Sequence, residues 1–538
     1  MMRYLLHDVF TENCRKRPDA TAIVNEDGSR LTYADVNALS NRFATIIAPL
    51  KSNIRAQPFV GVISPVHAAS IAAVLGTLKL GCAYVPLDEY SPTERLAKII
   101  DNTKLDVLCV DSNLYAEHAA LFDHPHIGKV ILLNGDVAVS SSSKNILFKD
   151  VLAAKDVEPP LLNQVCDDLA YILHSSGSTG VPKGIMLTHR NARTFTDWMQ
   201  AEFKLTPQDV VASRAPFKFD LSVFDIFNTF QAGATLACFD WNKKREADAK
   251  HADYVALLER ENVTMLYTTP STFIALLNRG GLADAQLKLR TIMYAGEPFP
   301  PAQLKKVMEA LPGVGVANIY GPTETNIITY YWVPEPPQTD DPIPLGAVVE
   351  DTEILVVSED RARVCAPNEL GELWCRGGTV TLGYLGMDDK TRDSLVQSPV
   401  HPYPALFWRT GDFGFYDQQG VLHYRGRRDH MVKVKGFRIE LGEIENALSQ
   451  FASLDEFAVV AVPDAKYGNR LYCHFAALKG RSANEGELRE FLAKKLPEYM
   501  IPFAFTGWDT LPKTSSGKVD RVLLAEKSAT AAEFKQAV

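Results

Sequence analysis

Short apolar runs rich in β-branched residues alternate with amphipathic stretches in the first part of the chain. Phe59 to Ser64 are followed by Ala68 to Lys79, and Val107 to Val110 are followed by Leu114 to Phe122. Strand-like runs that alternate with helical patterns indicate βαβ units and a parallel sheet. Because 538 residues exceed what one hydrophobic core usually holds, the length predicts several structural units.

The pattern changes after Leu370. Short strands are expected at Gly371 to Cys375, Phe407 to Trp408 and Val421 to Tyr424, separated by Gly and Asp turns. Beyond Asp429 the pattern predicts, in order, a strand around Val432 to Val434, a helix over Leu441 to Phe451, strands at Phe457 to Val462 and Leu471 to Ala477, and a helix over Glu485 to Lys495. We therefore expect a multidomain α/β fold: a large N-terminal core over residues 1–428, ending in a small β unit, and a small α+β domain over residues 429–538.

Composition limits the partners. The formal net charge is -9 and the pI about 5.8, which predicts no general attraction to nucleic acid or to anionic lipid. Apolar stretches are interrupted well before the ~20 residues that cross a bilayer, so no membrane span is expected. The eight cysteines are scattered and form no CxxC pair, and Met1 to Phe10 lack a secretion signal. These features predict a cytoplasmic protein with reduced thiols.

The strongest local signal is the segment from Tyr171 to Gly184, a strand followed by a loop dense in Gly, Ser and Thr with one lysine. Backbone N–H groups and hydroxyls of such a loop can enclose a polyphosphate whose charge a lysine partly offsets. It is not a Walker A loop, because Pro182 and Gly184 occupy places where that motif needs Gly and Ser or Thr. A flexible surface turn would explain the Gly and Ser residues but not the whole string.

Eight further segments follow in a fixed order: Phe219 to Phe227, Tyr294 to Glu297, Asn318 to Glu324, Gly371 to Trp374, Trp408 to Asp412, Tyr424 to Asp429, Val432 to Glu440 and Leu511 to Lys518. With the Gly-rich loop, they resemble the motifs of the adenylate-forming superfamily of acyl-CoA synthetases, luciferases and nonribosomal peptide synthetase adenylation domains. The resemblance covers nearly the entire chain. It implies a large N-terminal domain and a mobile C-terminal domain that serve an AMP-forming ligase reaction.

The resemblance implies ATP and Mg²⁺, with ATP contacts at Ser175, Ser176, Gly177, Ser178, Thr179, Gly180, Lys183, Gly296, Glu297, Asn318, Tyr320, Gly321, Thr323, Asp412, Tyr424, Arg427 and Lys518. Glu324 is implied as the Mg²⁺ contact, and a carboxylate suits this hard cation. Asp412 is implied to accept the ribose hydroxyls, and Tyr320 to stack on adenine. Without the resemblance, Thr323 and Glu324 could be a helix cap and a solvated acid, and Tyr320 an ordinary half-buried aromatic residue.

Two lysines are implied as catalytic, together with Thr323 and Glu324. Attack of a carboxylate on the α-phosphorus brings two anions together, so the cation of Lys518 would lower the repulsion. The resemblance makes Asp429 the hinge about which the C-terminal domain rotates, after which Lys433 replaces Lys518 near the site. One departure is Met431, where the family commonly has Gln.

Asp220 matches the residue that pairs with the α-amino group in amino-acid-activating members, and burying an ammonium group needs such a counter-charge. The other explanation is an aspartate that caps the following helix. The resemblance extends the substrate pocket to Leu221, Phe224, Thr268, Met293, Ala295, Ile319, Ile327 and Ile328. This apolar set predicts a small apolar amino acid.

The chain also resembles L-proline–carrier protein ligases of pyrrole-forming pathways, in the insertion that holds Leu395 to Pro399 and His401 to Pro404. Proline is therefore the leading candidate. D-alanine or another small amino acid, an acyl- or aryl-CoA ligase, and a non-catalytic nucleotide sensor are the alternatives. Only 20 residues follow Lys518 and no Gly-Gly-x-Ser site appears. The thiol is expected to come from a separate holo carrier protein, with coenzyme A as the alternative.

Overall fold

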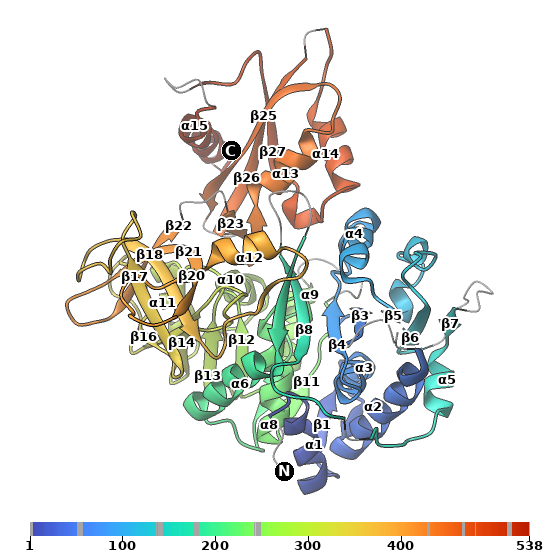
Figure 1. The fold of residues 1–538 in the computed structure, drawn as a ribbon. Helices are drawn as coiled ribbons and strands as arrows, with labels where there is room; N and C mark the ends of the chain where they lie inside the picture. The colour runs from blue at the N-terminus through green and yellow to red at the C-terminus, as the bar shows by residue number, and fades with distance from the viewer. Residues whose placement is uncertain are drawn as a thin grey trace.

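The computed structural model of the chain describes residues 4–50, 57–135, 137, 144–160, 162–175, 182–241, 243, 249–427, 431–464, 468–478, 480–513 and 519–536. It has a large N-terminal α/β domain and a smaller C-terminal domain, drawn in orange to red at the top of Figure 1. The predicted fold class is confirmed. The exact boundary after residue 428 stays a prediction, because residues 428–430 lie outside the described part.

The larger of the two main sheets has nine strands. Their spatial order is β16 (Ala347–Val348), β15 (Thr329–Val333), β14 (Gly315–Tyr320), β13 (Thr291–Tyr294), β12 (Met265–Thr268), β10 (Val210–Ala212), β11 (Thr235–Ala237), β1 (Thr21–Val24) and β2 (Arg30–Thr32). From β14 through β1 neighbouring strands are parallel, and the outer strands are antiparallel. The carboxyl ends of the parallel strands therefore meet at one edge, where ligands commonly bind.

The second main sheet has eight strands. Their order is β19 (Gly383–Tyr384), β9 (Lys183–Thr188), β8 (Leu169–Ser175), β4 (Ala83–Pro86), β3 (Phe59–Ile63), β5 (Val107–Asp111), β6 (Lys129–Leu133) and β7 (Asn145–Ile146). Strands β8 and β9 are antiparallel and flank residues 176–182. The predicted strand before the Gly-rich loop is confirmed.

The helices are α1 (Asp8–Lys16), α2 (Tyr33–Ile47), α3 (Ala68–Lys79), α4 (Thr93–Thr103), α5 (Phe148–Ala153), α6 (His189–Phe203), α7 (Leu221–Val223), α8 (Thr229–Ala232), α9 (Ala249–Arg260), α10 (Pro270–Arg279), α11 (Pro301–Ala310), α12 (Asp388–Ser394), α13 (Leu441–Leu448), α14 (Glu485–Ala493) and α15 (Arg521–Gln536). One core cluster joins both main sheets with α2, α3 and α6. All twelve residues of α3 are buried, which explains why apolar residues predominate in this helix.

The remaining strands form the small β unit and the C-terminal domain. The β unit comprises β17 (Thr352–Val357), β18 (Gly371–Gly377), β20 (Leu395–Gln397), β21 (Leu406–Tyr416) and β22 (Leu422–Arg427). The C-terminal domain contains the hairpin of β23 (Met431–Val434) and β24 (Phe437–Glu440), and a sheet of β25 (Leu454–Asp464), β26 (Gly468–Ala477) and β27 (Ala504–Trp508). The predicted strands and helices of this region are confirmed, while β17, β20, β24, β27, α12 and α15 are additional.

One prediction is wrong. The amphipathic stretch from Leu114 to Phe122 forms two 3₁₀ turns, Ser112–Leu114 and Ala119–Leu121, rather than a crossover helix. The side chain of Asp111 accepts the Asn113 N–H at 2.8 Å, and the Ser112 hydroxyl donates to the Leu133 carbonyl at 2.6 Å. These side-chain bonds compete with helix formation in a segment that is too short to nucleate a stable helix.

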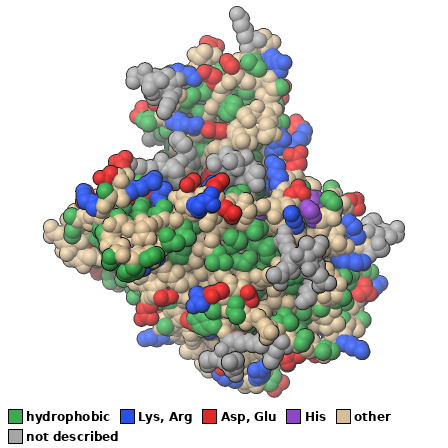
Figure 2. Space-filling view, in the orientation of Figure 1, with side chains coloured by type: hydrophobic (Ala, Val, Ile, Leu, Met, Phe, Trp, Pro, Cys, Tyr) green, Lys and Arg blue, Asp and Glu red, His purple; other side chains and the backbone are tan. Residues whose placement is uncertain are grey.

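The surface agrees with the composition. Acidic and basic side chains are interspersed over the face shown in Figure 2. Within the described ranges, no helix combines the length and apolarity needed to cross a bilayer. All eight cysteines lie in described segments, and each is a free thiol there.

Candidate functional site

A cavity of about 770 Å³ lies where the carboxyl ends of the nine-stranded sheet meet the β23–β24 hairpin of the C-terminal domain. Strand β12 ends in Thr268, and β13 and β14 are directly followed by Ala295 and Gly321. All three residues line the cavity, together with the predicted site residues Asp220, Leu221, Gly296, Thr323, Ile327, Asp412, Arg427 and Lys433. The structure thus brings together residues from six of the recognised motifs.

The loop after β14 requires glycine at position 321. A Cβ atom there would lie 1.6 Å from the carbonyl oxygen of Asn326, a distance that no side chain tolerates. This close approach folds the loop back on itself, so that Thr323 faces the cavity while Glu324 is buried with 1% exposure.

Asp412 organises one side of the cavity. The Tyr320 hydroxyl donates to Asp412 Oδ2 at 2.6 Å, and Arg427 Nη1 donates to Asp412 Oδ1 at 2.9 Å. Asp412 and Arg427 are direct cross-strand partners on β21 and β22. The rings of Tyr320 and Tyr424 lie 6.3 Å apart at 45°. An acidic group fixed between a phenol and a guanidinium, with aromatic faces nearby, is suited to hold a sugar and a base.

Two predicted nucleotide contacts are arranged differently. The Asn318 side-chain amide donates to the Pro344 carbonyl at 2.7 Å, and Asn318 does not line the cavity. Glu297 is buried behind the wall, where its Oε2 accepts the Ser271 N–H at 3.1 Å. Burial raises the pKa of Glu297, although the amides of Ser271 and Gly436 act in the opposite direction.

The predicted phosphate and metal residues are engaged by the hairpin. Lys183, at the start of β9, forms a buried ion pair with Glu440. Glu324 accepts a hydrogen bond from the Tyr384 hydroxyl at 2.8 Å and pairs with Arg438. Burial alone would raise the pKa of Glu324, but Arg438, Tyr384 and Lys183 outweigh it and hold that pKa below its ordinary value. In this arrangement Arg438 offsets the charge of Glu324, and Glu440 offsets that of Lys183.

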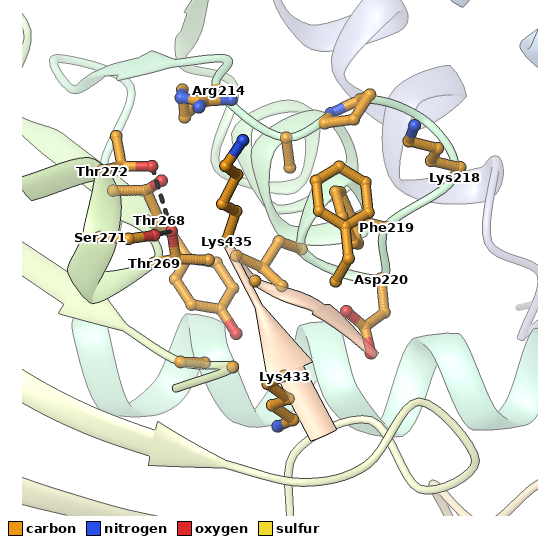
Figure 3. A pocket seen from close by; sticks show the side chains of 18 of the residues that line it. Arg214, Lys218, Phe219, Asp220, Thr268, Thr269, Ser271, Thr272, Lys433 and Lys435 are labelled. Carbon is orange, nitrogen blue, oxygen red and sulfur yellow. Dashed lines mark hydrogen bonds between the residues drawn. The ribbon is translucent and has the colours of Figure 1, made fainter. Parts of the chain in front are cut away.

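Asp220 lies at the other wall of the cavity, directly before α7 (Figure 3). The helix it begins continues through a π-helical segment, Phe224–Asn228, into α8; such segments often mark functional sites. Burial raises the pKa of Asp220, and the Thr323 hydroxyl and the Lys433 ammonium only partly offset this effect. A buried carboxylate in this state favours a cationic ligand.

The predicted pocket residues divide into two groups. Leu221, Thr268, Ala295 and Ile327 line the cavity beside Asp220, whereas Phe224, Met293, Ile319 and Ile328 are buried in the shared core behind it. The second group can shape the pocket only through the first. Figure 3 also shows a row of hydroxyls, with Thr269 Oγ1 3.0 Å from Ser271 Oγ and 3.1 Å from Thr272 Oγ1.

Lys433 extends from β23 into the cavity on the side of Asp220. Burial lowers the pKa of Lys433, and the nearby cations Arg438 and Arg427 lower it further, whereas Asp412 and Asp220 act to raise it. Met431, the departure from the family pattern, also lines the cavity and contacts the Arg438 guanidinium through its sulfur. The hairpin thus supplies both a cation and a wall to the site.

Several predicted residues lie outside the described part of the chain: Ser176, Gly177, Ser178, Thr179, Gly180, Asp429 and Lys518. Ser175 ends β8, and its buried hydroxyl makes no hydrogen bond to the described residues. Leu511, the first residue of the last motif, and Val519, directly after it, pack in a core cluster of the C-terminal domain. Lys513 pairs with Glu456 at 2.6 Å.

Arg438, Glu440 and Tyr384 contact the site and were not predicted for it. The first two belong to the recognised segment from Val432 to Glu440, where charged residues at alternate positions of a short strand are the signal. Tyr384 comes from β19 at the edge of the eight-stranded sheet, and its sequence context carries no signal.

Comparisons with known proteins agree over the whole chain. A family model described as "AMP-binding enzyme" matches residues 10–385, and one described as "AMP-binding enzyme C-terminal domain" matches residues 443–518. The chain is 32% identical to an L-proline–[L-prolyl-carrier protein] ligase of Pseudomonas fluorescens, over 97% of this chain and 99% of the relative. It is 31% identical to tyrocidine synthase 3 of Brevibacillus parabrevis over 98% of this chain, but spans only 8% of that protein.

A solved structure shows the same fold. The amide bond synthetase McbA from Marinactinospora thermotolerans aligns with a TM-score of 0.83 and 20% identity, covering 97% of this chain and 99% of that one. At this identity the likeness concerns the fold alone.

Proposed function

Since the chain belongs to the AMP-binding enzyme family, we propose that it activates a small apolar amino acid, with L-proline the leading candidate, and transfers it to the phosphopantetheine thiol of a separate carrier protein. The observation that carries the proposal is one cavity lined both by Asp220 and by Asp412 with Arg427, while Tyr320 donates a hydrogen bond to Asp412. The first fits an ammonium group, and the second fits a nucleoside. The relatives named as prolyl ligases support the choice of proline.

In the first half-reaction the amino acid carboxylate attacks the α-phosphorus of ATP, and pyrophosphate leaves. Asp220 would hold the ammonium group, Asp412 the ribose, and Lys183 with residues 175–180 the phosphates, while Lys518 offsets the charge at the reacting phosphorus. Glu324 would hold Mg²⁺, which offsets further phosphate charge, and Thr323 would contact a phosphate. The fit of the metal rests on Glu324, a buried carboxylate with a lowered pKa whose partner Arg438 belongs to the other domain.

In the second half-reaction the thiol sulfur attacks the carbonyl carbon of the adenylate, the thioester bond forms and AMP leaves. We assign the described arrangement to this step, because the hairpin brings Lys433 into the cavity and places Arg438 and Glu440 against the metal and phosphate residues. ATP with Mg²⁺ and the inserted hairpin then compete for Glu324 and Lys183. The two half-reactions would use residues 1–428 with two orientations of residues 429–538.

ATP–pyrophosphate exchange over the twenty amino acids, D-alanine and several aryl acids tests the proposal. We expect exchange that depends on one small apolar amino acid, with proline giving the highest kcat/KM. Thioester formation is then compared between holo carrier protein and free coenzyme A, and we expect the carrier to be preferred. Exchange with aryl acids alone, or with no acid, would contradict the assignment of Asp220.

The pair of Glu440 with Lys183 leads to a separate prediction. Glu440→Gln leaves Lys183 buried without a counter-charge when the hairpin is inserted, but not when phosphates are bound. We therefore expect transfer to slow by about tenfold to a hundredfold, and adenylation to slow much less. Single-turnover transfer from supplied aminoacyl adenylate, beside exchange, measures both. Glu490→Gln on the surface of α14, where the residue pairs with Lys494, is the matched control. Equal slowing of both steps would argue against the competition.

A further inference from the structure

The end of the cavity away from Lys433 contains a half-buried arginine whose Nε atom is fully buried. Arg214 follows β10, lines the cavity and stacks its guanidinium carbon 4.0 Å from the centre of the Trp241 ring. Burial lowers its pKa. Within the described residues, its side chain has no ion pair, and its Nε is buried without a hydrogen-bond acceptor. A buried cation in this condition is costly unless an anion joins it.

The carboxyl group of Asp225, which binds the Arg214 backbone, does not neutralise the guanidinium. Asp225 Oδ2 accepts the backbone N–H groups of Arg214 and Ala215 at 3.1 and 3.3 Å. Burial raises the pKa of Asp225 to about 8, although the two amides and the Arg214 charge act to lower it. The carboxyl is therefore mostly protonated at neutral pH. Asp225 therefore holds the backbone of this loop in place and leaves the guanidinium charge largely uncompensated.

Other cations gather at the same end. Figure 3 shows the Lys435 side chain extending toward Arg214, while Lys433 on the same hairpin runs toward the side of Asp220. Lys250 and Arg279 also line the cavity, and eight Lys and Arg residues line it in all, against the three carboxylates Glu89, Asp220 and Asp412, counted over the described residues. Lys435 and Arg279 are exposed, so this end opens to solvent.

The ligand must suit this arrangement. A planar guanidinium beside an ammonium group is the usual combination for a phosphate, and Arg is well suited because it binds two phosphate oxygens at once. In the proposed transfer step a thiol has to reach the Asp220–Lys433 end from outside, through an opening on the Arg214 side. A thiol on a long arm with a phosphate at its far end would place sulfur and phosphate at opposite ends of the cavity.

We propose that Arg214 and Lys435 bind the phosphate of the incoming phosphopantetheine arm. This inference rests on the proposed transfer step. Arg214 belongs to the large domain and Lys435 to the hairpin of the small one. A phosphate held between them stabilises the inserted position of the hairpin. The acceptor thus helps to hold the arrangement in which it reacts, and the site discriminates phosphorylated from unphosphorylated thiols.

The test compares pantetheine with 4′-phosphopantetheine as acceptors for wild-type enzyme loaded with aminoacyl adenylate. We expect a higher kcat/KM for the phosphorylated thiol, and a loss of this preference by about tenfold or more in Arg214→Gln and in Lys435→Ala. Arg214→Lys should restore part of it. Arg190→Gln is the control, since Arg190 is an exposed arginine that pairs with Asp167 and does not line the cavity. Because pantetheine serves as internal reference, damage to the fold lowers both rates and leaves the ratio unchanged.

A ratio near one in the wild type, or an unchanged ratio in both variants, overturns the proposal. Holo carrier protein and coenzyme A carry the same phosphopantetheine unit, so both are tested as acceptors. If the variants change KM for coenzyme A alone, the phosphate bound at this site does not come from a carrier protein. Binding of phosphopantetheine to the full chain can be measured by calorimetry without any amino acid. Loss of exchange with every amino acid alongside retained phosphopantetheine binding would therefore reject the proposed amino acid activation and not this site.

Discussion

The Asp220→Asn variant is expected to raise the KM for the amino acid by about 10²-fold or more in ATP–pyrophosphate exchange. Removal of one partner of a buried ion pair costs roughly 3–5 kcal/mol, and about 1.4 kcal/mol corresponds to a factor of ten. Asparagine preserves the shape of the side chain, so the loss reports charge rather than a void. Asp123→Asn, at an exposed turn, is the control. An unchanged KM would mean that the α-amino group binds elsewhere.

The pH dependence of the same reaction gives a second reading of Asp220. Burial raises the pKa of this carboxyl above its ordinary value. The ammonium group needs the carboxylate form, so kcat/KM should fall as the pH drops through this raised pKa, that is, at a higher pH than for an exposed aspartate. The Asn variant should lack this acidic limb. A limb that persists unchanged would belong to another group.

Much of the fold could be predicted from local pattern. The runs Phe59 to Ser64 and Ala68 to Lys79 became β3 and α3 almost to the residue, because a fully apolar strand and a fully apolar helix have few other places than the interior. The helix predicted for Leu114 to Phe122 is wrong because of contacts with other parts of the fold. The side chains of Asp111 and Ser112, just before this segment, bind the Asn113 amide and the Leu133 carbonyl at the end of β6, and no pattern of apolar residues reveals such bonds.

The candidate site was predictable as a set of residues but not as an arrangement. Asp220, Thr323 and Asp412 share one cavity although nearly two hundred residues separate the first from the last. The family assignment from the motifs is confirmed by the matching models. The contacts of Arg438 with Glu324 and of Glu440 with Lys183 cross between domains, and sequence alone does not tell which orientation of the domains is populated.

These interdomain pairs give a physical reason for our proposal that a different lysine serves each half-reaction. Buried ion pairs stabilise little in net terms, but breaking one by removing a single partner is costly. Lys183 and Glu324 are never left without partners if the hairpin replaces phosphate and metal as these depart. In the described arrangement Lys433 lines the cavity, so we propose that it supplies the cation of the transfer step.

Lys518→Ala is accordingly expected to slow adenylation by about 10²–10³-fold, the size of effect seen when a single group that stabilises developing charge is removed. Transfer from supplied adenylate should remain close to the wild-type rate, because the described cavity of the inserted hairpin is lined by Lys433. Exchange and single-turnover transfer, measured on the same preparations, give the ratio of the two effects. Glu440→Gln should show the opposite ratio, since it affects only the inserted position. If both variants slowed the same half-reaction, the assignment of one lysine to each step would be wrong, and a single orientation of the domains would have to serve both.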